Sequence, residues 1–80
     1  MRKVGQIYKQ ANGEKFVISH IADGDCFLIY NDGYTACYEN KESTFIFNTL
    51  ITEYPTWQEA VNSKEFNEWL GMICMKKPNN

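Results

Sequence analysis

Residues 5–38 decide the fold, and they read GQIYKQANGEKFVISHIADGDCFLIYNDGYTACY. Three turn signals recur in this stretch at spacings of 11 and 9 residues, namely Asn12-Gly13, Asp23-Gly24 and Asp32-Gly33. An Asn or Asp followed by Gly readily takes positive φ at both centres of a type I′ turn. Because β-branched and aromatic residues fill the runs between these turns, the stretch predicts an antiparallel meander of four strands.

The turns also predict which side chains share a face of the sheet. If every turn has two residues, one row contains Ile7, Ile18, Ile29 and Ala36, and we assign this row to the core. A neighbouring row on the same face is predicted to contain Gly5, His20, Phe27 and Tyr38. The opposite face is mixed and contains Gln6, Tyr8, Val17, Ser19, Leu28, Tyr30, Thr35 and Cys37. A half-buried sheet shows cleaner alternation, so the sheet either curls into a small barrel, is covered on both faces, or leaves one face open for a partner.

The remaining third of the chain predicts one more strand and a helical segment. Residues 44–52 alternate well enough to read as a fifth strand. Thr56 and Glu59 have the form of a capping box, and Ser63 opens a second helix start. These signals leave open one bent helix or two short helices with a break at Asn62. We therefore expect a single α+β domain over residues 1–80, with its sheet within 4–52 and its helical segment within 56–75.

Composition excludes several classes of function. The formal net charge of −2 gives no electrostatic footprint for duplex DNA or an anionic membrane surface. The three cysteines are odd in number and have no CxxC spacing, which indicates a reduced, cytoplasmic protein. No apolar run approaches the roughly 20 residues that a membrane-spanning helix needs. We expect no membrane partner, and the charge disfavours nucleic acid as a partner.

No catalytic constellation is predicted. His20 is the only histidine, which excludes a histidine-based metal cluster or a two-histidine mechanism. Ser19 is expected to point to the opposite face from His20, because neighbouring residues of a strand alternate. Cys26 and Cys37 are predicted to share the face opposite to His20, and the turn aspartates are accounted for by their turns. The sequence therefore predicts a protein that is not an enzyme, with no catalytic residues, no metal site and no cofactor.

The surplus of aromatic residues favours a binding role instead. We predict that Tyr8, Tyr30 and Tyr34 line a rim that contacts a protein or a small ligand. Small barrels also stack single-stranded nucleic acid on such rings, but those sites usually interleave Lys and Arg. Few basic residues lie near the predicted sheet, so the nucleic-acid barrel is kept as an alternative only.

Two stretches resemble a known class of small proteins. Val4-Gly5-Gln6-Ile7-Tyr8, followed by residues 12–18, is similar to the start of small SH3-like or related β proteins in phage and prophage genomes. Residues 54–66 resemble the tail of such accessory proteins. The resemblance implies a small SH3-like barrel in the host cytoplasm, without enzymatic activity. It further implies an anti-defence inhibitor that binds a host protein or complex, or alternatively a sponge for a signal nucleotide, with self-association left open.

Overall fold

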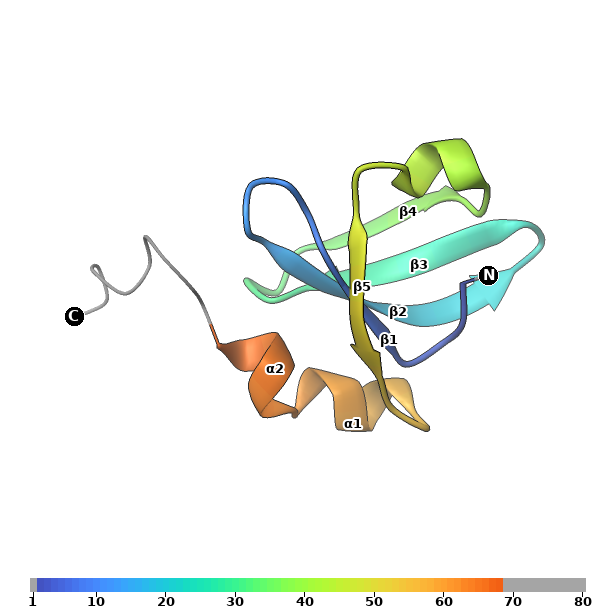
Figure 1. The fold of residues 1–80 in the computed structure, drawn as a ribbon. Coiled ribbons are helices and arrows are strands. Elements are labelled where there is room, and N and C mark those ends of the chain that lie inside the picture. The colour runs from blue at the N-terminus through green and yellow to red at the C-terminus, as the bar shows by residue number, and fades with distance from the viewer. Residues whose placement is uncertain (1, 69–80) are drawn as a thin grey trace.

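The computed structural model describes residues 2–68, and Figure 1 shows their arrangement. One antiparallel sheet contains five strands, which are β1 (Gln6–Lys9), β2 (Lys15–Ala22), β3 (Asp25–Tyr30), β4 (Thr35–Glu39) and β5 (Thr49–Glu53). Their order in the sheet is β4-β3-β2-β1-β5, so the chain returns to pair β5 with β1. Strands β4 and β5 are therefore the two edges of an open sheet. The predicted α+β architecture, an antiparallel sheet followed by C-terminal helices, is confirmed.

Two short α-helices follow the sheet, which decides between the two helical alternatives. Helix α1 spans Trp57–Val61 and helix α2 spans Lys64–Asn67. The Thr56 hydroxyl accepts a hydrogen bond from the Glu59 amide at 3.1 Å, and the Ser63 hydroxyl accepts one from the Phe66 amide at 3.2 Å. Each helix therefore has its own N-cap, as the two start signals predicted. The part of the predicted helical segment beyond residue 68 lies outside the described residues. No helix among residues 2–68 has the length and apolar character to cross a membrane.

The predicted register is wrong at two of the three turns. The pairs Tyr8↔Phe16 and Ile29↔Thr35 place three residues, rather than two, in the first and third loops. Gly13 and Gly33 occupy the last position of these loops with φ of +94° and +92°. Only the turn at Asp23-Gly24 has two residues, as expected. A shift of one residue moves every side chain of a strand to the other face.

The sheet is consequently apolar on both faces. On the inner face the buried cluster contains Tyr8, Phe16, Ile18, Cys26, Leu28, Tyr30 and Phe45. On the outer face Ile7 and Val17 pack against Ala60 and Phe66 of the helices. Ile7 and Ile18 therefore lie on opposite faces, and the single predicted core row is wrong. Next to the second turn His20 pairs with Phe27, as predicted. A bulge between Ile18 and His20 shifts the register beyond that point, so Ile18 pairs with Leu28 and not with Ile29. Both faces of the sheet are therefore packed, which is one of the alternatives that the sequence left open, and α1 and α2 cover the outer face at β1 and β2 (Figure 1).

The predicted fifth strand is correct only in its second half. Residues Glu42–Phe45 form a 3₁₀ helix, η1, and β5 begins at Thr49. Phe45 is buried in the inner cluster at 3% exposure, whereas Phe47 is 81% exposed. Three apolar residues in succession, Phe45 to Phe47, do not alternate, and a tight turn sends them in different directions. Figure 1 shows η1 and the following turn on the opposite side of the sheet from α1 and α2.

Candidate functional site

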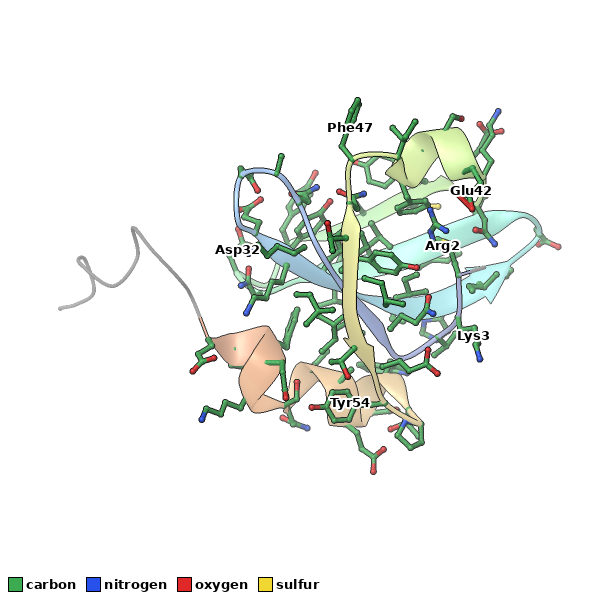
Figure 2. All side chains as sticks on the ribbon, in the orientation of Figure 1. Arg2, Lys3, Asp32, Glu42, Phe47 and Tyr54 are labelled. Atoms are coloured by element: carbon green, nitrogen blue, oxygen red, sulfur yellow. The ribbon has the colours of Figure 1, made fainter. Side chains whose placement is uncertain are left out.

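The turn between η1 and β5 exposes two adjacent large apolar side chains. Ile46 is 66% exposed and Phe47 is 81% exposed. Figure 2 shows Phe47 at the tip of this turn, directed away from the body of the protein. Phe45 anchors the turn from below, because its ring is buried and its carbonyl accepts a hydrogen bond from the Asn48 amide at 3.0 Å. The buried ring therefore fixes the backbone that presents its two neighbours to solvent.

A cavity of about 330 Å³ opens beside this turn. It is lined by Gln10, Phe16, Leu28, Tyr30, Tyr38, Ser43, Thr44, Phe45, Ile46, Phe47 and Asn48. Its floor is the buried inner cluster, and its rim carries neutral hydroxyl and amide groups. No charged side chain is among these lining residues. We call Ile46, Phe47 and this cavity the Phe47 surface.

The hydrogen-bonding groups in the cavity are hydroxyls and side-chain amides. The Tyr30 hydroxyl accepts a hydrogen bond from the Gln10 side-chain amide at 3.2 Å. Burial raises the pKa of Tyr30 above its usual value, since the phenolate would lose its hydration. The cavity thus offers aromatic walls with a few fixed neutral donors and acceptors, which suits an apolar or uncharged polar group.

Arg2 holds the same turn from another side. Its guanidinium carbon lies 4.4 Å from the centre of the Phe45 ring and 5.3 Å from that of Tyr8. Its Nη1 atom lies 3.6 Å from a carboxylate oxygen of Glu42. Figure 2 labels both residues, which lie close together beneath η1. The Arg2 side chain is only 9% exposed. A cation stacked on an aromatic face stabilises both, so η1 is clamped between this arginine and the inner cluster.

The three predicted site tyrosines do not form one rim. Tyr8 is buried at 6% exposure and stacks on Phe16, with ring centres 5.5 Å apart. Tyr30 is buried at 7% and lies 5.8 Å from the ring of Tyr34, which is 65% exposed. The structure therefore brings Tyr30 and Tyr34 together and places Tyr8 beyond Phe16, in the interior. Tyr8 and Tyr30 share one face, as expected, but they are not exposed, because Phe16 and Phe45 pack against them in a second core.

Phe47 was not predicted as a site residue, because residues 44–52 were expected to form a regular strand. In a regular strand, Phe45 and Phe47 would point to the same face and would be expected to be equally buried. The signal that distinguishes them is the run of three apolar residues after the polar stretch 40–43, which favours a turn over an alternating strand.

The surroundings of His20 also differ from the prediction. Because the bulge breaks the alternation, the Ser19 hydroxyl lies 3.2 Å from His20 Nδ1, contrary to the expected separation. That hydroxyl donates its proton to the Phe27 carbonyl at 3.1 Å, so it is committed to the backbone. His20 lies between the rings of Phe27 and Trp57, with centres 6.4 Å and 6.0 Å away.

The two described cysteines lie on opposite faces rather than together. Cys26 is buried on the inner face, and burial raises the pKa of its thiol. Cys37 is exposed and shares the outer face with His20, but Phe27 lies between them in the cross-strand row. Two strand spacings separate the outer pair by roughly 10 Å, which is beyond the reach of proton transfer.

Within residues 2–68, no group of three or more His, Cys, Asp or Glu side chains gathers in a way that could hold a metal ion. Among the residues that the structure describes, the exposed Phe47 and the adjoining cavity make the Phe47 surface the strongest candidate site. Comparisons of the chain with protein-family models, with curated proteins and with solved structures found no match in any of the three.

Proposed function

We propose that this chain is a non-enzymatic binding protein that acts by occupying a surface on another protein, with the Phe47 surface as its contact. The observation that carries this proposal is the 81% exposure of Phe47 on a turn held by a buried phenylalanine. A prominent apolar side chain beside an aromatic cavity favours association with another surface. Aromatic anchors of this kind supply much of the binding free energy in protein interfaces.

The way in which the turn is held supports a preformed contact. Phe45, Arg2 and the Asn48 amide hold the turn in place before any partner arrives. A preorganised anchor loses less conformational entropy on binding than a flexible one. The apolar rings at the centre and the neutral amides at the rim of the cavity match the usual anatomy of an interface.

The charge of the cavity favours a protein over a phosphate-bearing ligand. Recognition of a nucleotide or of single-stranded nucleic acid needs Lys or Arg near the phosphates. The residues that line the cavity are all uncharged. Burial of Tyr8 and Tyr30 also removes two of the three rings on which a nucleic-acid platform depended. The nucleotide sponge and the nucleic-acid barrel are therefore less well supported alternatives.

The resemblance to small phage accessory proteins extends the proposal to a class of partner. On that extension, the chain inhibits a host protein or complex in the host cytoplasm by covering a functional surface with Phe47. An accessory protein of 80 residues can act in this way without any chemistry of its own, since occupancy of the partner is sufficient.

The test compares Phe47→Ser with a matched substitution of another exposed apolar residue, Ile51→Ser. Ile51 is 38% exposed on β5 and does not line the Phe47 cavity. Immobilised wild-type protein and both variants are exposed to host lysate, and affinity for the recovered partner is then measured by calorimetry. We expect Phe47→Ser to weaken binding at least about 30-fold, the range of an interface hot spot, and Ile51→Ser to leave it within about threefold. Equal affinity of the two variants would contradict the proposal.

A further inference from the structure

Strand β4 presents an open, regular edge. Its pairing with β3 runs without a bulge from Asp25↔Glu39 to Ile29↔Thr35. Its sequence, Thr35-Ala36-Cys37-Tyr38-Glu39, contains neither Lys nor Pro, the residues that commonly protect such edges. The other edge differs, since a bulge interrupts the pairing of β5 with β1. Within residues 2–68, no segment pairs with the outer side of β4.

The hydrogen bonds at the ends of this hairpin show which backbone groups point outward. The Tyr30 amide donates to the Tyr34 carbonyl at 2.7 Å, and the Asn40 amide donates to the Gly24 carbonyl at 2.9 Å. Bonded and non-bonded pairs alternate along an antiparallel ladder. The even-numbered residues of β4 therefore bond to β3, and Thr35, Cys37 and Glu39 direct their N–H and C=O groups away from the sheet.

We propose that this edge pairs antiparallel with β4 of a second copy of the chain, about a two-fold axis at Cys37. In this register Cys37 faces its own counterpart, Ala36 faces Tyr38, and Thr35 faces Glu39. All three outward residues then find backbone partners. The charges are also compatible, because Glu39 meets a neutral threonine, whereas a pairing centred on Glu39 would place two carboxylates opposite each other.

The side chains along β4 support this occupant. Tyr38 is 46% exposed on the inner face, and its ring would cover the small Ala36 of the second copy. On the outer face Phe27 is 39% exposed beside an open groove of about 430 Å³ that Cys37 and Thr35 also line. A strand added alongside β4 would cover the open side of that groove. The product is one continuous ten-stranded sheet that presents two Phe47 surfaces, so a dimeric target would be held bivalently.

Disulfide trapping tests the register directly. All trapping variants carry Cys74→Ser, and Cys26 is retained because it is buried. Diamide serves as oxidant and takes up the two protons and two electrons that a pair of thiols releases. With Cys37 present, we expect a covalent dimer, since directly opposed residues of a bonded pair lie about 5.5 Å apart at Cα, within the range of a disulfide.

Two further variants, both with Cys37→Ser, separate a specific register from random collision. One carries Thr35→Cys and the other carries Glu39→Cys. We expect a mixture of the two to form a mixed dimer, whereas each alone forms at least about fivefold less, since like positions lie about 13 Å apart along the strands. Failure of the Cys37 protein to cross-link would overturn the proposal. Equal cross-linking of the mixture and of each of the two variants alone would also overturn it.

Light scattering of the unoxidised protein provides an independent measurement. Cys37→Pro removes an outward N–H and leaves the bonds between β3 and β4 intact, while Cys37→Ser keeps the N–H. We expect a concentration-dependent dimer for wild type and Cys37→Ser, and a monomer for Cys37→Pro. A wild-type protein that stays monomeric up to millimolar concentration would contradict the proposal. None of these readouts depends on Phe47 or on a protein partner, so their failure would leave the proposed function untouched.

Discussion

Gly5 and Tyr54 cross so closely that a Cβ atom at Gly5 would lie 2.2 Å from the Tyr54 carbonyl oxygen. The Tyr54 amide donates to the Gly5 carbonyl at 3.0 Å, and the Gly5 amide donates to the Ile18 carbonyl at 2.9 Å. This crossing joins the end of β5 to the start of β1 and to β2. It therefore connects the segment that carries the helices to the meander, and Gly5 also adopts φ of +94°.

Gly5→Ala should be among the most destabilising single substitutions in the chain. The left-handed conformation alone costs about 1–2 kcal/mol for a residue with a Cβ, and the clash with backbone adds to it. Gly13→Ala is the matched control, because Gly13 has the same φ of +94° but open space around it. Urea unfolding should show a clearly larger loss of unfolding free energy for Gly5→Ala. Equal losses would mean that the close crossing does not matter.

The buried side chain of Lys15, on β2, joins helix α2 to the sheet by hydrogen bonds. It is only 5% exposed, and its ammonium donates to the carbonyls of Glu65 and Glu68 at 2.5 and 2.8 Å. Lys15→Met keeps the aliphatic stem and removes these bonds, so we expect a loss of about 1.5–3 kcal/mol, the range for charged hydrogen bonds. The control is Lys9→Met at the neighbouring cross-strand position. Chemical denaturation measures both, and a Lys15→Met protein as stable as the control would refute this role.

The contact between Tyr54 and Glu65 predicts a pH dependence of stability. The Tyr54 hydroxyl donates to the Glu65 carboxylate, which lowers the pKa of Glu65 below its usual value. A lowered folded-state pKa stabilises the fold above the unfolded pKa of about 4.3, and this contribution disappears as pH falls through the folded pKa. Tyr54→Phe should therefore lower Tm at pH 7, and this effect should disappear as the pH falls through the folded-state pKa of Glu65. In a Glu65→Gln background the same substitution should show no such pH dependence, and a persistent one would contradict the assignment.

Truncation to alanine should strongly lower the free energy of unfolding at Phe45 and barely change it at Phe47. Phe45 is 3% exposed in the inner cluster, and Phe45→Ala should cost about 3–5 kcal/mol of unfolding free energy. Phe47→Ala removes a solvent-exposed ring and should change it by less than about 0.5 kcal/mol. Thermal or urea unfolding of the two variants decides the matter. A large loss for Phe47→Ala would show that this ring serves the fold rather than an interface.

The element order of this fold could be predicted from turn dipeptides, but the register could not. Asn12 and Asp32 accept hydrogen bonds from the amides of Glu14 and Tyr34, both at 2.9 Å. These local bonds favour a three-residue loop in which only the glycine is left-handed. At the second turn Asp23 itself has φ of +51°, and a two-residue turn results. The same kind of dipeptide thus gives both loop lengths, and the three-residue first loop places Ile18 on the opposite face from Ile7.

The exposure of Phe47 could not be predicted from the sequence for a related reason. Whether Phe45 or Phe47 is buried depends on a 3₁₀ turn that packs against the inner cluster and against Arg2, a residue more than forty positions from Phe45 in the sequence. Long-range packing of this kind overrides the local strand pattern. The tyrosines were chosen by the same local pattern, and two of them are core residues because the face that they share packs against Phe45. Tyr34 alone retained the exposure that the sequence indicated.

Site-specific photo-crosslinking tests the central claim most directly, namely that the Phe47 surface contacts a protein partner. A benzophenone amino acid replaces Phe47 in one protein and the exposed Glu59 of α1 in another, and each is irradiated with the captured partner. The claim predicts a covalent complex from position 47 and none from position 59. A complex that forms from position 59 but not from position 47 would contradict it.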